Sequence, residues 1–121
     1  MRGFRFVIAA GFLAVIGAPT GAAPPGSFNA IASAGDNESI GMALARRQIA
    51  RGETVDALAT LERVIILHPQ SMAARLLHAG VLCLADDRQG SLIEFERLRG
   101  YSFSKAQWAE ATAPCRARTG G

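Results

Sequence analysis

The fold is decided by residues 38–71, which read ESIGMALARRQIARGETVDALATLERVIILHPQS. From Ser39 to Arg51 the apolar residues recur three, four and five positions apart without strand-like alternation, and this spacing favours a helix. Gly52 ends that helix, and Thr54 is placed to cap the next one. Pro69 ends the second helix, because the residue before a proline is disfavoured in helical geometry. One apolar stripe along the second helix contains Val55, Leu58, Leu61, Val64 and Ile65.

Two more helices are predicted directly after this hairpin. Ser71 is placed to cap a helix from residue 72 to about residue 85, and a turn at Asp86 and Asp87 follows it. Residues 91–99 predict the next helix, with Gly100 as a left-handed closing residue.

A fifth helix, over residues 105–113, has the clearest local signals in the chain. A capping box and a hydrophobic staple mark its start, and Pro114 is expected to stop it. The residues placed for these two motifs are Ser104 with Gln107 and Phe103 with Trp108. With no strand pattern and only short connections, the sequence predicts an all-α fold of antiparallel helical hairpins.

The first 23 residues have the three parts of a secretory signal peptide. Arg2 and Arg5 form a basic start, residues 6–18 are uncharged and mostly apolar, and small residues lead up to Ala23. The apolar part is shorter than the roughly 20 residues of a membrane span, although an uncleaved anchor stays an alternative. Residues 24–36 are rich in Pro, Gly, Ser, Ala and Asn and are expected to form a flexible linker. The helical domain is then 37–113, followed by a tail over 114–121.

The charge balance argues against a nucleic-acid-binding protein. The full chain has 13 Lys+Arg against 10 Asp+Glu, and removal of Arg2 and Arg5 with the leader leaves 11 against 10. A net charge of +1 gives little means of neutralising phosphates. Mixed charges such as Glu94, Glu96, Arg97 and Arg99 are typical of a solvent-exposed helix face.

The two hairpins show the same residue classes at a spacing of 34 residues. Ala45 falls on Ala79, and Leu61 falls on Phe95. The period and pattern resemble those of tetratricopeptide repeats. The first repeat, about 38–71, matches at Leu44, Ala45, Gly52, Ala57 and Pro69 and departs from the pattern at Gly41 and Gln48. The second, about 72–105, is the weaker match and has Phe103 in place of the closing proline.

The resemblance implies a short α-solenoid whose first helices line a concave groove for a partner protein or peptide. The corresponding groove positions are Met42, Arg46, Ile49, Leu76, Gly80 and Cys83, and Arg46 with Arg75 would engage acidic groups of the partner. The alternative is that the apolar members of this set belong to the core. Because about three repeats are usually needed for stability, the helix over 105–113 is expected to cap the array, with Trp108 covering Phe95 and Leu98.

Cys83 and Cys115 are the only cysteines in the sequence. In an up-down-up arrangement the third and fifth predicted helices run parallel, so both cysteines lie at the same end of the domain. An exported chain meets an oxidising compartment, and we therefore expect a disulfide between them. A buried free thiol at Cys83 is the alternative.

The sequence offers no set of residues for catalysis, a cofactor or a metal. His78 with Cys83 supplies only two of the three or four ligands that zinc requires, and the sequence contains no second cluster of Cys and His. His68 stands apart from both residues in the sequence. No nucleophile, base and orienting acid fall together. The chain is therefore expected to be non-enzymatic.

The expected function is that of a protein–protein interaction scaffold in the bacterial cell envelope, periplasmic or secreted, without membrane insertion after the leader is removed. The envelope assignment depends on the leader, and the bacterial one on the exported members of the resembled family. The competing hypothesis is a self-associating structural oligomer with no separate ligand.

Overall fold

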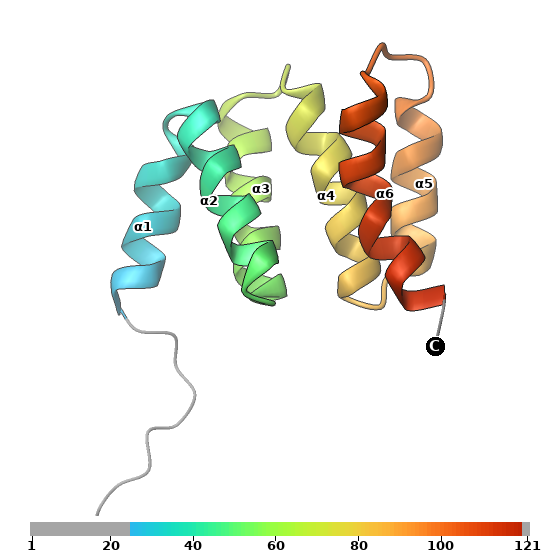
Figure 1. Ribbon diagram of the computed structural model, residues 1–121. Coiled ribbons are helices and arrows are strands. Elements are labelled where there is room, and N and C mark those ends of the chain that lie inside the picture. Colours follow the sequence, from blue (N-terminus) through green and yellow to red (C-terminus); the bar gives the residue numbers. More distant parts are fainter. Residues whose placement is uncertain (1–24, 120–121) are drawn as a thin grey trace, which may run out of the picture.

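The computed structural model describes residues 25–119, and this part of the chain is mostly helical, without any strand. Six helices follow one another: α1 (Pro25–Gly35), α2 (Glu38–Ala50), α3 (Thr54–Leu67), α4 (Met72–Leu84), α5 (Arg88–Leu98) and α6 (Lys105–Thr119). Figure 1 shows them side by side, with successive helices running in opposite directions. The predicted all-α class is confirmed. The predicted signal peptide, residues 1–23, lies outside the described residues.

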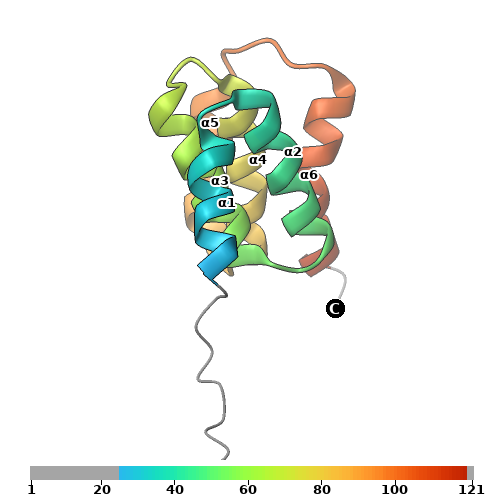
Figure 2. The same ribbon diagram turned by 90° about the vertical axis from the view of Figure 1, so that its left-hand side faces the viewer.

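Helix α4 lies in the middle of the molecule, where it packs against α3, α5 and α6. Helices α1 and α2 pack on α3 and on each other, as the turned view in Figure 2 also shows. The main core lies between α2, α3 and α4 and contains Met42, Ala45, Ala57, Leu61, Val64, Ala74, Leu77 and Val81. Alanines at these positions let the helix backbones approach closely. Ala45 and Ala79, 34 positions apart in the sequence, are both 0% exposed.

A second core joins α4, α5 and α6, with Leu76, Leu98 and Ala111 at its centre and three aromatic side chains around them. The Trp108 ring lies 5.9 Å from that of Phe95 and 5.5 Å from that of Phe103, between ring centroids. The expected staple and the expected cover over Phe95 are therefore confirmed. The capping box is confirmed as well: the Gln107 backbone N–H donates to Ser104 Oγ, and the Ser104 N–H donates to Gln107 Oε1.

The expectation of a flexible linker over residues 24–36 is wrong for most of that segment. Residues 25–35 form α1, which packs on α3 and α2. His68, at the end of α3, donates from Nε2 to the Gly35 carbonyl oxygen at 3.0 Å. Ala34 is buried at 7% exposure. The small residues that suggest a linker permit this close packing, so the helical unit begins before residue 37.

Pro114 does not stop the last helix, which was expected to end at residue 113. Instead α6 continues through Pro114 to Thr119. Proline lacks the N–H that would bond one turn back, which removes one helical hydrogen bond without forbidding the next turn. The neighbouring Cys115 is bonded to Cys83 of α4, with Sγ atoms 2.03 Å apart, as the sequence predicts. This bond fixes the last turn of α6 beside α4, so the predicted tail is largely helix.

Local signals at the other helix ends are partly confirmed. Ser71 caps α4 by accepting from the Ala74 N–H, and Gly52 has the positive φ of a closing glycine, +74°. Gly100 was expected in the same conformation, but its φ is not positive. The residue at the cap position of α3 is Glu53 in place of Thr54. In the described residues, none of the helices combines the length and apolar character that crossing a membrane requires.

Candidate functional site

The expected groove between α2 and α4 is largely filled by α6. Leu76 is 2% exposed in the second core, and Gly80 lies against the α6 backbone at Ala111. The space left between α2, α4 and α6 has a volume of only about 10 Å³. A volume of that size holds at most one water molecule. A peptide therefore cannot enter there while α6 is in place.

The other predicted groove residues are divided between the core and two separate surfaces. Met42 is buried in the main core, and Ile49 packs against it. Arg46 forms an ion pair with Glu110 of α6, at 2.5 Å between Nε and Oε1. Arg75 lies away from these three, on the opposite side of α4 among α3 and α5 residues. The structure thus does not bring the predicted set together in one groove.

A broad depression of about 570 Å³ does remain beside Met42 and Arg46, at the start of α2. Its polar groups already have partners within the protein. Glu38 accepts from the Ser71 hydroxyl at 2.6 Å, and the Asn37 side chain caps α2. His68 is bonded to Gly35, as described above. This depression therefore presents no buried group that still needs a partner.

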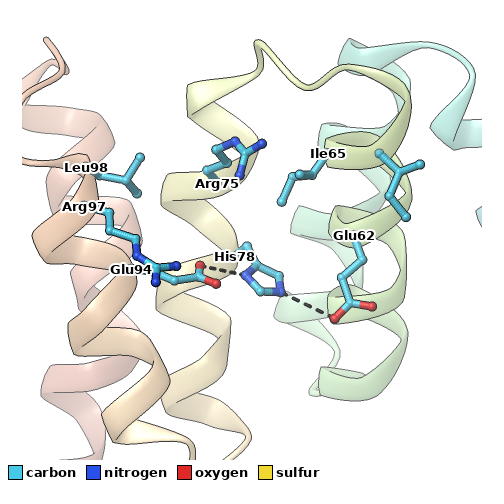
Figure 3. A pocket seen from close by; sticks show the side chains of 8 residues that line it. Glu62, Ile65, Arg75, His78, Glu94, Arg97 and Leu98 are labelled. Atoms are coloured by element: carbon cyan, nitrogen blue, oxygen red, sulfur yellow. Dashed lines mark hydrogen bonds and ion pairs between the residues drawn. The ribbon is translucent and has the colours of Figure 1, made fainter.

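A pocket of about 320 Å³ on the other side of α4 has different properties. It opens between α3 and α5, and α4 forms its base (Figure 3). We call it the His78 pocket. Its lining consists of Glu62, Ile65 and Ile66 from α3, Arg75 and His78 from α4, and Glu94, Arg97 and Leu98 from α5. The volume is at the lower end of the range for ligand sites in proteins.

His78 lies between two carboxylates at the base of this pocket (Figure 3). Its Nδ1 is 2.8 Å from Glu94 Oε2, and its Nε2 is 3.6 Å from Glu62 Oε1. The side chain is nine-tenths buried, and Nε2 has no hydrogen-bond partner. Burial alone would lower the pKa of His78, but the hydrogen bond and charge of Glu94, and then the nearby charge of Glu62, outweigh it and raise the pKa above 6.5.

The lining of the His78 pocket combines apolar and charged side chains. Ile65, Ile66 and Leu98 supply apolar walls, and Ile66 is 72% exposed although it is a large aliphatic residue. Arg75 and Arg97 add two basic side chains to the lining. Arg75 donates from Nη2 to the Pro69 carbonyl oxygen at 3.4 Å. Within the described chain, the ion pairs of Glu62 and Glu94 are made with His78 and with neither arginine.

Sequence reasoning assigned Glu94 to an ordinary solvent-exposed face and did not connect it with His78. Glu94 lies 16 positions after His78, and Glu62 lies 16 positions before it. In antiparallel helices of this length such a spacing places three residues at one level of three neighbouring helices. This spacing of 16 residues was the sequence signal that could have connected Glu62 and Glu94 with His78, but many pairs of charged residues share it by chance.

A metal site at His78 and Cys83 does not fit the structure. Cys83 is bonded to Cys115, and a disulfide sulfur lacks the thiolate that binds zinc. Within residues 25–119, no group of three or more His, Cys, Asp or Glu side chains is arranged to hold a metal ion. Comparison with known proteins gives no further assignment: no family model, no curated protein and no solved structure matches the chain.

Proposed function

We propose that the protein is a non-enzymatic helical scaffold that binds a partner protein through the His78 pocket. The observation that carries this proposal is the combination of an exposed aliphatic side chain, Ile66, on the wall with a buried, unpartnered imidazole nitrogen at the base. A buried polar atom without a partner costs free energy, and a ligand that supplies the partner recovers it. Apolar walls such as Ile66 supply affinity when they are covered.

The two hairpins, α2 with α3 and α4 with α5, are proposed to be tetratricopeptide-like repeats. The 34-residue register and the complete burial of both Ala45 and Ala79 support this. In this interpretation α6 is the capping helix that occupies the inner face. Binding then uses the outer face, between the second helices of the two repeats. The leader pattern supports export to the bacterial envelope, as periplasmic or secreted protein.

A photo-crosslinking amino acid at position 66 tests the binding site in the cells that produce the protein. The matched control has the same amino acid at Val55, which is on the same helix, is 78% exposed and does not line the pocket. We expect position 66 to crosslink one discrete protein that position 55 does not reach. The same product from both positions, or no product from position 66, would contradict the proposal.

Self-association is the second candidate, favoured by exposed aliphatic residues on α3 and α5 such as Ile66, Leu92 and Ile93. It predicts that the product from position 66 is a crosslinked pair of this same chain. It also predicts a sedimentation coefficient that rises with concentration. A monomer at all concentrations, together with a crosslink to a different protein, would reject self-association and support the scaffold.

A further inference from the structure

The base of the His78 pocket is acidic in either protonation state of the imidazole. Glu62 comes from α3 and Glu94 from α5, and His78 of α4 lies between them. With both carboxylates ionised, the net charge of these three groups is −1 when His78 is protonated and −2 when it is neutral. These three groups therefore attract an arriving positive charge, while Arg75 and Arg97, which also line the pocket, repel it.

The unpartnered nitrogen specifies the kind of group that fits. The Nδ1–H of His78 donates to Glu94, which leaves Nε2 of the neutral imidazole as a hydrogen-bond acceptor. The carboxylate oxygen Oε1 of Glu62 lies 3.6 Å from this Nε2 atom and is also an acceptor. Two acceptors cannot satisfy each other. A group with several N–H donors, placed on the pocket side of both atoms, would satisfy both.

The walls suit the stem of such a group. Ile65, Ile66 and Leu98 line the same pocket as the imidazole and contribute methyl groups to it. A chain of methylene groups that ends in a charge matches this order of apolar wall and acidic base. Long basic side chains have this construction, because their stems bury along apolar surface while the charged ends reach polar partners.

We propose that the His78 pocket receives a basic side chain of the partner protein, a lysine or an arginine, whose charged end bonds both His78 Nε2 and the Glu62 carboxylate. This inference rests on the proposed function, because it names the chemistry of the partner at the same site. The positive charges of Arg75 and Arg97, which also line the pocket, disfavour further basic residues next to the inserted one. The complementary partner surface therefore has a single basic residue with apolar and acidic neighbours.

An acidic side chain is the opposite alternative, since Arg75 and Arg97 also line the pocket. To reach His78 Nε2 it would have to approach Glu62, whose side chain is 62% exposed at the same place. Like charges at this separation repel. Arg75 also already contacts the Pro69 carbonyl. The observations therefore favour the basic side chain, and the acidic one becomes an outcome of the test.

Proton binding and cation binding at Nε2 exclude each other, and this gives the proposal a distinctive pH dependence. The charged groups that face His78 are Glu62 from α3, Arg75 from α4, and Glu94 and Arg97 from α5. The carboxylates raise the pKa of His78 above 6.5 in the free protein. A bound cation must lower this pKa, and its affinity must rise as the pH increases through it. A bound acidic group would have the opposite effects.

NMR titration of the full chain tests the proposal, with the imidazole resonances of His78 as the signal. The probe is Nα-acetyl-lysine methylamide, and the two comparison probes are the uncharged norleucine analogue and the acidic glutamate analogue. We expect the lysine probe to bind about tenfold more tightly than norleucine, a difference of about 1.4 kcal/mol, because its ammonium group makes charge-assisted hydrogen bonds. The pKa of His78 is expected to fall as the lysine probe saturates.

Two variants separate a specific site from general attraction. Glu62→Gln removes one acceptor charge at an exposed position and is expected to weaken the lysine probe about tenfold. Glu96→Gln is the matched control, because Glu96 lies on α5 outside the pocket and pairs with Arg99 on the surface. It is expected to leave the affinity unchanged. Circular dichroism establishes that both variants are folded.

Three results would overturn the inference: equal affinity for lysine and norleucine probes, tighter binding of the glutamate probe with a raised His78 pKa, or equal effects of the two glutamate variants. None of these affects the crosslinking result from position 66, which tests the proposed function itself. If that crosslink forms and persists in Glu62→Gln while the lysine probe fails, the partner site stands and the basic side chain is wrong.

Discussion

Helices α1 and α6, the first and last of the described chain, are attached to the rest of the molecule in different ways. α1 packs on α3 and α2 through small residues such as Ala34, while its Phe28 is 75% exposed. α6 packs on α4 through Ala111, is joined to it by the Cys83–Cys115 disulfide, and places Trp108 among two other aromatic rings. One end of the molecule is held by non-covalent contacts, including the hydrogen bond from His68 to Gly35, and the other by a covalent bond as well. We therefore expect the two ends to open with different free energies.

Removal of the disulfide should have the largest effect on the difference in opening free energy between α1 and α6. The bond closes a loop of sequence separation 32, and the double variant Cys83→Ser with Cys115→Ser should lose about 3–4 kcal/mol of unfolding free energy on the chain-entropy estimate. Urea denaturation of the full chain measures this loss. Hydrogen exchange should accelerate most in α6, so that the exchange rates of α6 approach those of α1. A loss below about 1 kcal/mol would mean that packing alone holds α6.

A methyl group at Gly80 should have the next largest effect. A Cβ at this position would overlap the carbonyl oxygen of Ala111, so α4 and α6 would have to move apart. Gly80→Ala should therefore destabilise the protein by about 1–3 kcal/mol, as overpacking does. Gly100→Ala is the matched control, because no atom lies within 4 Å of its added Cβ. Equal thermal stability of the two variants would show that α6 does not pack closely against α4 at Gly80.

Loss of the bond between His68 and Gly35 should have the smallest effect of the three. His68→Ala removes one hydrogen bond to the last residue of α1 and should cost about 1 kcal/mol. Hydrogen exchange should show the effect in α1 and leave α6 unchanged. Gln70→Ala, at an exposed position two residues further on, is the control and should change neither helix. Faster exchange in α6 would indicate that the two ends open together.

The sequence predicted the helices of residues 38–113 because their signals are local. The stripe of α3, the cap of α4 at Ser71 and the capping box of α6 each depend on residues within one or two turns. It missed α1, whose Pro, Gly, Ser and Ala residues carry no helical stripe. It also ended the last helix at residue 113, because proline usually stops a helix, whereas α6 continues to Thr119 and is bonded to α4 through Cys115.

The candidate site could be predicted only in part. His78 was considered as an incomplete metal ligand with Cys83, and Arg75 was expected to contact a partner. Glu62 and Glu94 were not connected with it, since the contact spans 16 residues on either side and three separate helices. The groove residues Leu76 and Gly80 were assigned to an open face, and α6 covers that face.

The sequence by itself determined that residues 38–113 form helical hairpins, where most of these helices begin, and which cysteines pair. Each of these depends on the periodicity of apolar residues, on hydrogen bonds within a turn, or on the parallel direction of two helices. The tertiary structure alone decided which face is open. That choice depends on where the last helix packs, and contacts of high sequence separation leave no periodic trace in the sequence.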